Sequence, residues 1–412
     1  MMFARILDRV ISDGSVTIID ARGRRHEIGS GPEEVRVRLT DPATARRLAV
    51  NPYLHIGEAY MDGRLIIERG TLYDFLTLCY RDQARAHGGL VGTSWRLISR
   101  ALRFLHQYNP VPRARRNAAH HYDLSDTLYD LFLDRDHQYS CAYFTRPHDD
   151  LDKAQEDKKR HIAAKLLLAP GQRVLDVGSG WGGLALHLAR SGAGEVLGIS
   201  LAERQVEASR RRARRAGLDG RVRFELRDYR ELDGRFDRIV SVGMFEHVGV
   251  RHYRRFFERL RSLLKDDGVA LVHSIGRHDG PGATNPWMRK YIFPGGYAPA
   301  LSEVLPAIER AGLWVTDIEI LRLHYARTLR LWRQRFEANR PRIEAMYDAR
   351  FGRMWEFYLV GSELAFRHGG HMVFQIQLAR RQDAVPLTRN YMFGHVRDTD
   401  AGSAREGSVR AA

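Results

Sequence analysis

The amino-acid sequence predicts an α/β protein, in which a small α+β domain is followed by a larger domain built on a parallel sheet. Two patterns lead to this prediction. After residue 150, short apolar stretches alternate with helical stretches, as in a parallel sheet with helices on both faces. Before residue 90, strand-like stretches come first and a helical pattern follows them. The 412 residues are enough for two or three compact domains.

The first domain is expected at residues 1–90. Its strands are predicted where β-like stretches lie between Gly, Pro or Asp residues, at 16–19, 25–28 and 35–38. Asp41 precedes Pro42, which favours a helix start because the carboxylate can accept from unpaired backbone N–H groups. The helical pattern continues to about Ala86, so the rest of this domain is expected to be helical.

Residues 91–118 are expected to join the two domains. Between Trp95 and Gln107, apolar residues recur at helical spacing, and Arg96, Arg100 and Arg103 lie beside them. Such a helix can contact anionic lipid, or it can link two domains with its arginines in water, and the pattern fits both. Prolines and arginines follow it, as is typical of a linker.

The second domain is expected at residues 119–396, followed by a disordered tail at 397–412. Its strands are predicted at the apolar stretches 173–177, 195–199, 222–226, 238–242, 269–274, 314–320 and 372–378. Two helical stretches spanning about 326–368 precede the last strand. Small and polar residues dominate the tail, which predicts disorder there.

The composition restricts the compartment and the partners. Lys and Arg (66) outnumber Asp and Glu (50), and the formal charge of +16 favours anionic partners. The arginine run at 209–215 is predicted to be a solvated helix face, because no aromatic residues are interleaved with it as in a nucleic-acid patch. Two cysteines exclude a disulfide framework, and no apolar run approaches the roughly 20 residues of a membrane span. We therefore expect a cytoplasmic protein that contacts the inner face of a membrane.

A glycine-rich turn follows the first predicted strand of the second domain, at residues 176–180 (DVGSG). Glycines here let the backbone approach a ligand closely at the carboxyl edge of the sheet. A dinucleotide-binding fold would show a similar turn, but two features favour S-adenosylmethionine (SAM). Asp176 lies just before the glycines, as in class I methyltransferases, and the next strand ends without the carboxylate that binds an NAD ribose. Asp228 follows the third strand, where such methyltransferases hold the adenine.

Six motifs occur in the order seen in one enzyme family: residues 121–125 (HYDLS), 139–144 (YSCAYF), 178–183 (GSGWGG), 243–248 (GMFEHV), 273–276 (HSIG) and 290–296 (KYIFPGG). Through them, residues 115–395 resemble cyclopropane-fatty-acyl-phospholipid synthases and the related mycolic acid cyclopropane synthases. The resemblance implies the class I SAM-dependent methyltransferase fold, which is Rossmann-like with a mostly parallel sheet, an antiparallel last strand and helical insertions. The first domain resembles an extra domain of the phospholipid-acting enzymes, which the mycolic acid enzymes lack.

The resemblance also implies the reaction, in which a methylene passes from SAM to the cis double bond of an unsaturated phospholipid acyl chain. An alkene is a weak nucleophile, so the sulfonium methyl must be held in line with it in a dry site. A base must then remove a proton from the transferred methyl. In the family this base is bound bicarbonate, and its ligands fall by motif on Cys141, Glu246, His273, Ile275 and Tyr325. Tyr325 and His273 would donate hydrogen bonds to it, and Glu246 would accept its proton.

The motifs also imply which residues bind the cofactor. These are His121, Tyr139, Ser140, Asp176, Gly178, Ser179, Gly180, Ser200, Leu201, Gln205, Asp228 and Tyr229. The rings of Tyr139, Tyr143 and Phe144 are expected to offer π faces to the sulfonium and to the developing cation. No metal is expected, because the adjacent His120 and His121 point in different directions and no third ligand is suitably spaced.

One position departs from the family pattern. Ser362 stands where many members carry a cysteine, and we interpret this change as neutral because alkene methylation needs no covalent enzyme intermediate. Three alternatives remain open: a fatty-acyl methyltransferase giving a methyl-branched or methyl-alkene chain, a small-molecule N-methyltransferase, and a non-catalytic basic adaptor. The expected partners are an anionic phospholipid surface, the unsaturated phospholipid substrate and a second copy of the chain, without nucleic acid.

Overall fold

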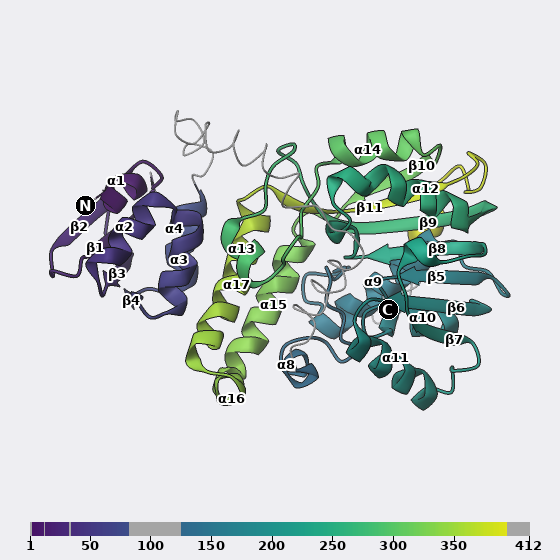
Figure 1. The fold of residues 1–412 in the computed structure, drawn as a ribbon, viewed down its shortest axis with the longest axis horizontal. Coiled ribbons are helices and arrows are strands. Elements are labelled where there is room, and N and C mark those ends of the chain that lie inside the picture. Colours follow the sequence, from purple (N-terminus) through teal and green to yellow (C-terminus); the bar gives the residue numbers. More distant parts are fainter. Residues whose placement is uncertain (1, 12, 33, 82–124, 394–412) are drawn as a thin grey trace, which may run out of the picture.

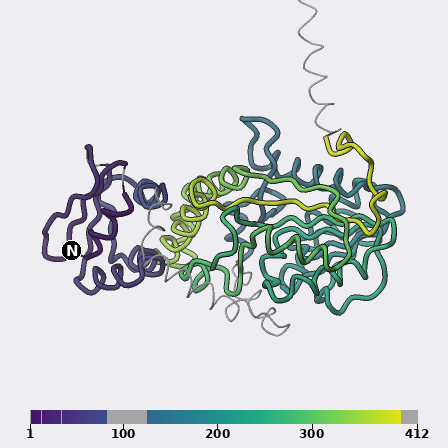
Figure 2. The backbone as a smooth tube through the Cα atoms, turned by 90° about the horizontal axis from the view of Figure 1, so that it is seen from above, coloured from purple at the N-terminus to yellow at the C-terminus, as the bar shows by residue number. Residues whose placement is uncertain are grey.

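The computed structural model describes residues 2–11, 13–32, 34–81 and 125–393, which form two α/β units (Figure 1). The predicted helix at 95–107, His121 and the predicted tail at 397–412 lie outside the described residues. Figure 2 shows the N-terminal unit, in purple, at one end of the molecule. Among the helices of the described ranges, none combines the length and the apolar character needed to cross a bilayer.

The N-terminal unit is a four-stranded sheet covered by helices. Its elements in chain order are α1 (Met2–Asp8), β1 (Gly14–Ile19), β2 (Arg25–Ser30), β3 (Val35–Leu39), α2 (Pro42–Val50), α3 (Pro52–Met61), β4 (Leu65–Arg69) and α4 (Leu72–Arg81). The strand order is β2-β1-β3-β4, with β1 and β3 parallel. As predicted, Asp41 caps α2, since its side chain accepts from the Thr44 N–H at 2.8 Å.

The prediction of helix from Asp41 to about Ala86 is wrong at β4. Gly63 and Gly70 adopt positive φ angles and turn the chain on either side of this strand. β4 pairs antiparallel with β3, and Leu65 lies opposite Leu39. Pairing with β3, more than twenty residues away in the chain, therefore decides the conformation of this segment. The helical periodicity of the flanking residues does not predict a strand here.

A seven-stranded sheet forms the larger unit. Its strands are β5 (Arg173–Val177), β6 (Glu195–Ser200), β7 (Val222–Leu226), β8 (Phe236–Val242), β9 (Leu264–Arg277), β10 (Trp314–Ile320) and β11 (His371–Ala379). All seven predicted strands are present. Their order is β10-β11-β9-β8-β5-β6-β7, and β11 runs antiparallel to both of its neighbours. This confirms the mostly parallel sheet with an antiparallel last strand.

Helices cover both faces of this sheet (Figure 1). They are α8 (Asp126–Asp130), α9 (Leu151–Lys165), α10 (Gly183–Arg190), α11 (Glu203–Arg215), α12 (Tyr253–Leu263), α13 (Pro286–Tyr291), α14 (Leu301–Arg310), α15 (His324–Ala338), α16 (Arg340–Met346) and α17 (Ala349–Arg367), with short 3-10 turns η1 (Tyr229–Glu231), η2 (Phe245–His247) and η3 (Val250–His252). Val174 packs with α9, α10 and α11, whereas Leu175 packs with α12 and α14. Because successive strand residues face opposite sides, each strand supplies two separate hydrophobic cores.

Helix α17 connects the two units. The region predicted as two helical stretches at about 326–368 forms three helices, α15, α16 and α17. Val360 and Leu364 of α17 lie in the hydrophobic core of the N-terminal unit. The Tyr60 hydroxyl of α3 donates to Glu356 of α17 at 2.6 Å. The N-terminal unit is therefore packed onto a helix that belongs to the larger unit.

Candidate cofactor pocket and reaction site

The glycine-rich turn joins β5 to α10 at the carboxyl edge of the sheet. Gly178 has a φ of +86°, and a Cβ added there would lie 2.8 Å from the Met244 Cβ. Gly182, the N-cap of α10, has a φ of +80°, and its Cβ would lie 2.6 Å from the Phe224 ring. Both positions require glycine for conformation and for space. The turn thus brings bare backbone to the place where open α/β sheets bind ligands.

One pocket lies at this edge of the sheet. Eleven of the twelve residues predicted to bind SAM line it: Tyr139, Ser140, Asp176, Gly178, Ser179, Gly180, Ser200, Leu201, Gln205, Asp228 and Tyr229. Residues that the motifs did not indicate also line it, among them His137, Gln138, Arg230, Met244 and His247. The structure brings the eleven together, and the contact that each makes with a ligand stays a prediction.

Two acceptors in this pocket lack a partner within the described ranges of the chain. Asp176 is buried, and its Oδ2 has no hydrogen-bond partner among the described residues. Ser179 Oγ is also buried without a partner in that part of the chain. Burial raises the pKa of the Asp176 carboxyl to about 7. Because an unpaired buried polar atom costs about 1–3 kcal/mol, such atoms indicate where a ligand binds. The hydroxyl and ammonium donors of SAM fit these acceptors.

Polar side chains predicted for the adenine and ribose sides of the pocket are already paired. Arg230 holds Asp228 through two bonds, Nε to Oδ1 at 2.8 Å and Nη2 to Oδ2 at 2.6 Å. Ser200 Oγ donates to Gln205 Oε1 at 3.2 Å on the ribose side. Our sequence reasoning missed Arg230, although its spacing of two residues from Asp228 was a usable signal.

Glu246, His273 and Ile275 meet where β8 and β9 run side by side. Val242, the last residue of β8, lies opposite His273, and Glu246 follows in η2. The Ile275 N–H donates to Glu246 Oε1 at 2.7 Å, so this backbone group is occupied by the chain itself. Glu246 Oε2 is buried without a partner among the described residues, and burial raises the pKa of this carboxyl to about 7. An unpaired acceptor therefore lies where the motifs predict the bicarbonate site.

A residue of β11 holds the neutral His273 ring in one tautomer. Gln375 Nε2 lies 3.1 Å from His273 Nδ1, and the two residues are opposite each other across the sheet. With the amide oriented so that Nε2 faces the ring, the amide donates, Nδ1 accepts, and the ring proton is on Nε2. Burial lowers the pKa of His273 to about 3, so the ring is neutral. Sequence reasoning missed Gln375, because sheet pairing alone brings it to His273.

Cys141 and Tyr325 lie in the aromatic core that α15 and α17 form. Cys141 is fully buried, its thiol donates to a neighbouring carbonyl at 3.4 Å, and burial raises the pKa of this thiol. The Tyr325 ring packs against Trp332 at 5.8 Å and Phe366 at 4.8 Å between centroids. Ile275 packs against the same core. The reaction side of the site is therefore apolar, and its thiol is neutral.

The prediction that three aromatic rings face the sulfonium is wrong for two of them. Tyr143 stacks between His161 and His324, with ring centroids 4.3 and 5.0 Å away. An arginine guanidinium lies 4.0 Å over the Phe144 ring. Both rings are thus covered by other side chains, a packing that the motif could not reveal. Tyr139 lines the pocket.

Two predictions about polar side chains have different outcomes. The arginine run is only partly solvated, because Arg212 donates to the Trp181 carbonyl at 2.7 Å and forms an ion pair with Asp136. Part of the run therefore stabilises the fold and does not face water.

In the described ranges, no cluster of three or more His, Cys, Asp and Glu side chains is arranged to hold a metal. The pair His120 and His121 lies outside these ranges.

Comparison with known proteins identifies the family. The family model for mycolic acid cyclopropane synthetase matches residues 111–376. The chain belongs to this family. The cyclopropane-fatty-acyl-phospholipid synthase of Escherichia coli K12 is 36% identical over 356 residues, which cover 85% of this chain and 89% of that protein. A probable fatty acid methyltransferase of Pseudomonas putida is 35% identical over 391 residues, covering 90% and 94%.

The solved structure of the mycolic acid cyclopropane synthase CmaA1, complexed with S-adenosylhomocysteine (SAH) and CTAB, superposes on this chain with a TM-score of 0.61 and 33% identity. It covers 66% of this chain and 98% of its own. As a member of the cyclopropane synthetase family, this chain is a SAM-dependent methyltransferase, and SAM is its cosubstrate. When bound, SAM supplies an electrophilic methyl group. That Asp176 and Ser179, whose buried acceptors have no partner in the described part of the chain, hold the cofactor stays a prediction.

Proposed function

We propose that the protein is a cyclopropane-fatty-acyl-phospholipid synthase, which adds a methylene from SAM across the cis double bond of an unsaturated acyl chain with bicarbonate as base. The pair formed by Glu246 and His273 carries this proposal. A buried carboxylate has one acceptor oxygen without a partner in the described chain. Its other oxygen accepts from the Ile275 N–H, two residues along β9 from His273, whose ring carries its proton on Nε2. An anion that both donates and accepts hydrogen bonds fits this pair, and bicarbonate has both properties.

The chemistry of the reaction explains why such a pair is needed. Attack of the double bond on the methyl group leaves a positive charge on the acyl chain, and ring closure requires loss of a proton from the transferred methyl. Bicarbonate, when bound, would supply the base. Glu246 would accept its hydroxyl proton and thereby orient a basic oxygen, while His273 would donate from Nε2 to hold it. Burial of Cys141 and Tyr325 beside the site excludes water that would otherwise capture the cation.

The N-terminal unit supports a phospholipid substrate. The CmaA1 structure, a mycolic acid enzyme, matches along nearly its whole length but covers 66% of this chain. The E. coli phospholipid enzyme covers 85% of this chain. The additional residues are therefore shared with the relative whose printed activity concerns phospholipids, and also with the P. putida relative, which covers 90% of this chain. They pack onto α17, which also contributes to the aromatic core next to the reaction site.

The proposal includes a peripheral position at the cytoplasmic face of the membrane and a homodimer. A chain embedded in a bilayer reaches a protein pocket only when the protein docks on the surface, and the +16 charge favours anionic head groups. Replacing Arg96, Arg100 and Arg103 by Glu should abolish binding to anionic vesicles and leave SAH affinity unchanged. Unaltered vesicle binding would exclude this segment as the docking element.

Lipids from cells that produce the protein provide the decisive test of the product. Mass spectrometry should show a gain of one CH₂ on unsaturated phospholipids, and proton NMR should show ring signals replacing olefinic ones. A retained olefinic signal, or a saturated methyl branch, would make the protein a fatty-acyl methyltransferase, the activity named for the P. putida relative. Turnover of a soluble amine without lipid modification would identify an N-methyltransferase.

A further inference from the structure

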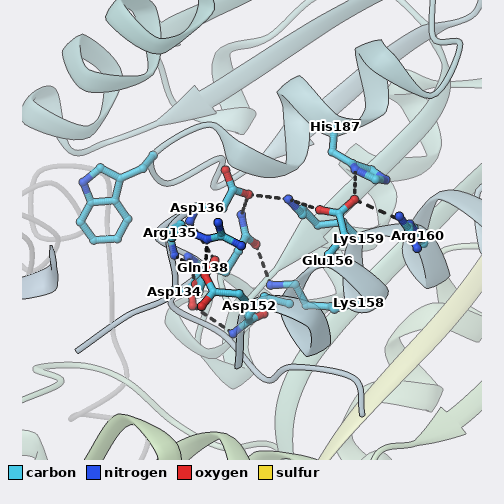
Figure 3. Close-up of polar contacts among 12 residues, drawn as sticks. Asp134, Arg135, Asp136, Gln138, Asp152, Glu156, Lys158, Lys159, Arg160 and His187 are labelled. Atoms are coloured by element: carbon cyan, nitrogen blue, oxygen red, sulfur yellow. Dashed lines mark hydrogen bonds and ion pairs between the residues drawn. The ribbon is translucent and has the colours of Figure 1, made fainter. Parts of the chain in front are cut away.

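Lys158 of α9 is a fully buried lysine that none of the steps above uses. Its Nζ donates to Gln138 Oε1 at 2.6 Å and to Ser140 Oγ at 2.8 Å. Figure 3 shows the side chain reaching from α9 to Gln138. Both partners are neutral, so the ammonium has no carboxylate in contact with it among the described residues. Burying a charge in this way costs several kcal/mol, which indicates a role beyond packing.

The ammonium determines the direction of the hydrogen bonds around it. An ammonium only donates, so Gln138 Oε1 and Ser140 Oγ must both accept. The Gln138 amide then donates from Nε2 to Asp136 Oδ2 at 3.0 Å (Figure 3). The Ser140 hydroxyl keeps one proton to donate, and no acceptor for it occurs among the described residues. Since Ser140 lines the SAM pocket, a ligand there is the acceptor that remains.

A second residue of α9 holds the same segment through its backbone. Gln155, which is fully buried, donates from Nε2 to the carbonyls of Gln138 at 3.2 Å and Ser140 at 3.0 Å. Gln155 and Lys158 are three positions apart, so they share one face of the helix. The position and the donor direction of Ser140 are therefore set before any ligand binds, which lowers the ordering cost of binding.

The charge of Lys158 acts on the same pocket. Burial lowers the pKa of Lys158 to about 8, so its amine is still charged at pH 7. Its charge opposes the rise that burial causes in the pKa of the Asp176 carboxyl and of the Cys141 thiol. The charge of Lys158 therefore favours a negative group beside Ser140, and it acts against the carboxylates of Asp134 and Asp136, which raise the pKa of Lys158.

We propose that Lys158 is a positioning residue that acts through Ser140 to recognise the carboxylate at the methionine end of SAM. The carboxylate is the one anionic group of SAM, so a serine proton supported by a buried cation selects this end of the molecule. The proposal deepens the SAM-binding role of the pocket and depends on neither bicarbonate nor the lipid product.

Calorimetric titration with two ligands tests this proposal without measuring activity. SAH carries the carboxylate, whereas 5′-methylthioadenosine lacks the whole amino-acid end. K158M and S140A should each weaken SAH binding about 10-fold, as expected for a charge-assisted hydrogen bond, and change methylthioadenosine binding less than about 2-fold. The double variant should bind SAH no more weakly than S140A, because Lys158 acts through Ser140.

Lys159 provides a matched control on the same helix. Its buried ammonium forms ion pairs with Asp136 at 2.7 Å and Glu156 at 2.8 Å (Figure 3). K159M should lower the thermal midpoint but leave the ratio of the two affinities unchanged.

Three results would overturn the proposal: equal weakening of both ligands in K158M, additive losses in the double variant, or an unchanged affinity ratio in S140A. If K158M does not fold, K158Q retains a neutral donor on a side chain one bond shorter and should show the same selective loss to a smaller degree. A wild-type protein that binds neither ligand would contradict the SAM-binding assignment itself, which separates that failure from failure of the role of Lys158.

Discussion

The cofactor pocket and the adjacent reaction site are built in opposite ways. The pocket takes most of its residues from the ends of β5, β6 and β7 and the turns that follow them, and several of its polar groups are paired with near neighbours, as Asp228 is with Arg230. The reaction site combines Cys141, Glu246, His273 and Tyr325, which are far apart in the chain and buried.

This difference follows from what each part must do. A polar ligand that enters from and returns to water can be recognised by local turns with exposed backbone groups. A positive charge on carbon must be protected from water, and only the packing of distant segments creates such an enclosure. Removing a reaction-site group should therefore affect turnover but not SAH affinity, whereas a pocket variant should show the reverse.

The largest effect is expected from Glu246→Gln. The amide keeps the volume but replaces one acceptor oxygen by a donor, so it cannot accept the bicarbonate proton. Turnover should fall by about 10²–10⁴-fold, the usual worth of general acid–base machinery, while the SAH dissociation constant stays unchanged. Lipid turnover and SAH calorimetry measure the two quantities, and undiminished ring formation would remove the proposed base site.

Asp176→Asn should act on the pocket alone. SAH affinity should fall about 10–100-fold because a charged acceptor is lost. The pKa of Asp176 rises from 3.8 to about 7 on folding, so the folded state holds this proton more tightly. Its stabilising contribution is present below pH 4 and is lost as the pH rises to 7.

The ligand-free Asn variant should therefore be more stable than the wild type at pH 8, by on the order of 1 kcal/mol, with a smaller difference at pH 5. Denaturant titrations at the two pH values measure this. A wild-type advantage at pH 8 would contradict the unpaired, buried state of the carboxylate.

Gln375→Leu should reduce turnover about 10-fold, the equivalent of one lost hydrogen bond, because His273 would no longer be held with its proton on Nε2. SAH affinity should not change. Gln377→Leu is the matched control, since Gln377 is equally buried two residues along β11 but donates to the Lys165 carbonyl. The control should lose stability and keep its turnover, so an equal loss of turnover in both variants would attribute the effect to strand packing.

The smallest effect is expected from Arg230→Met. This change removes the two bonds that orient Asp228, which is itself retained, so SAH affinity should fall about 3-fold by loss of a partly exposed ion pair. Turnover at saturating SAM should be unchanged. A large drop in turnover would show that a change in the cofactor pocket also disturbs the reaction site, which the separate contacts of the two parts do not predict.

Much of the molecule was predictable because its signals are local. The apolar stretches predicted all seven strands of the larger sheet, and the turn at 176–180 predicted where a ligand would meet backbone. Eleven cofactor residues were predictable from motifs because most of them lie at the ends of strands or in the turns that follow, and these strand ends converge at one sheet edge.

What the amino-acid sequence by itself determined was the order of the strands in the larger unit, the family and the chemical types at the site, since periodicity, turn residues and motifs depend on short stretches of chain. Only the tertiary structure decided the partners of those groups. It paired β4 with β3, Gln375 with His273 and Lys158 with Ser140, and it covered Tyr143 with two imidazoles. These contacts depend on packing between segments distant in the chain, and the free energy of a buried polar group is set by that packing and not by its neighbours in sequence.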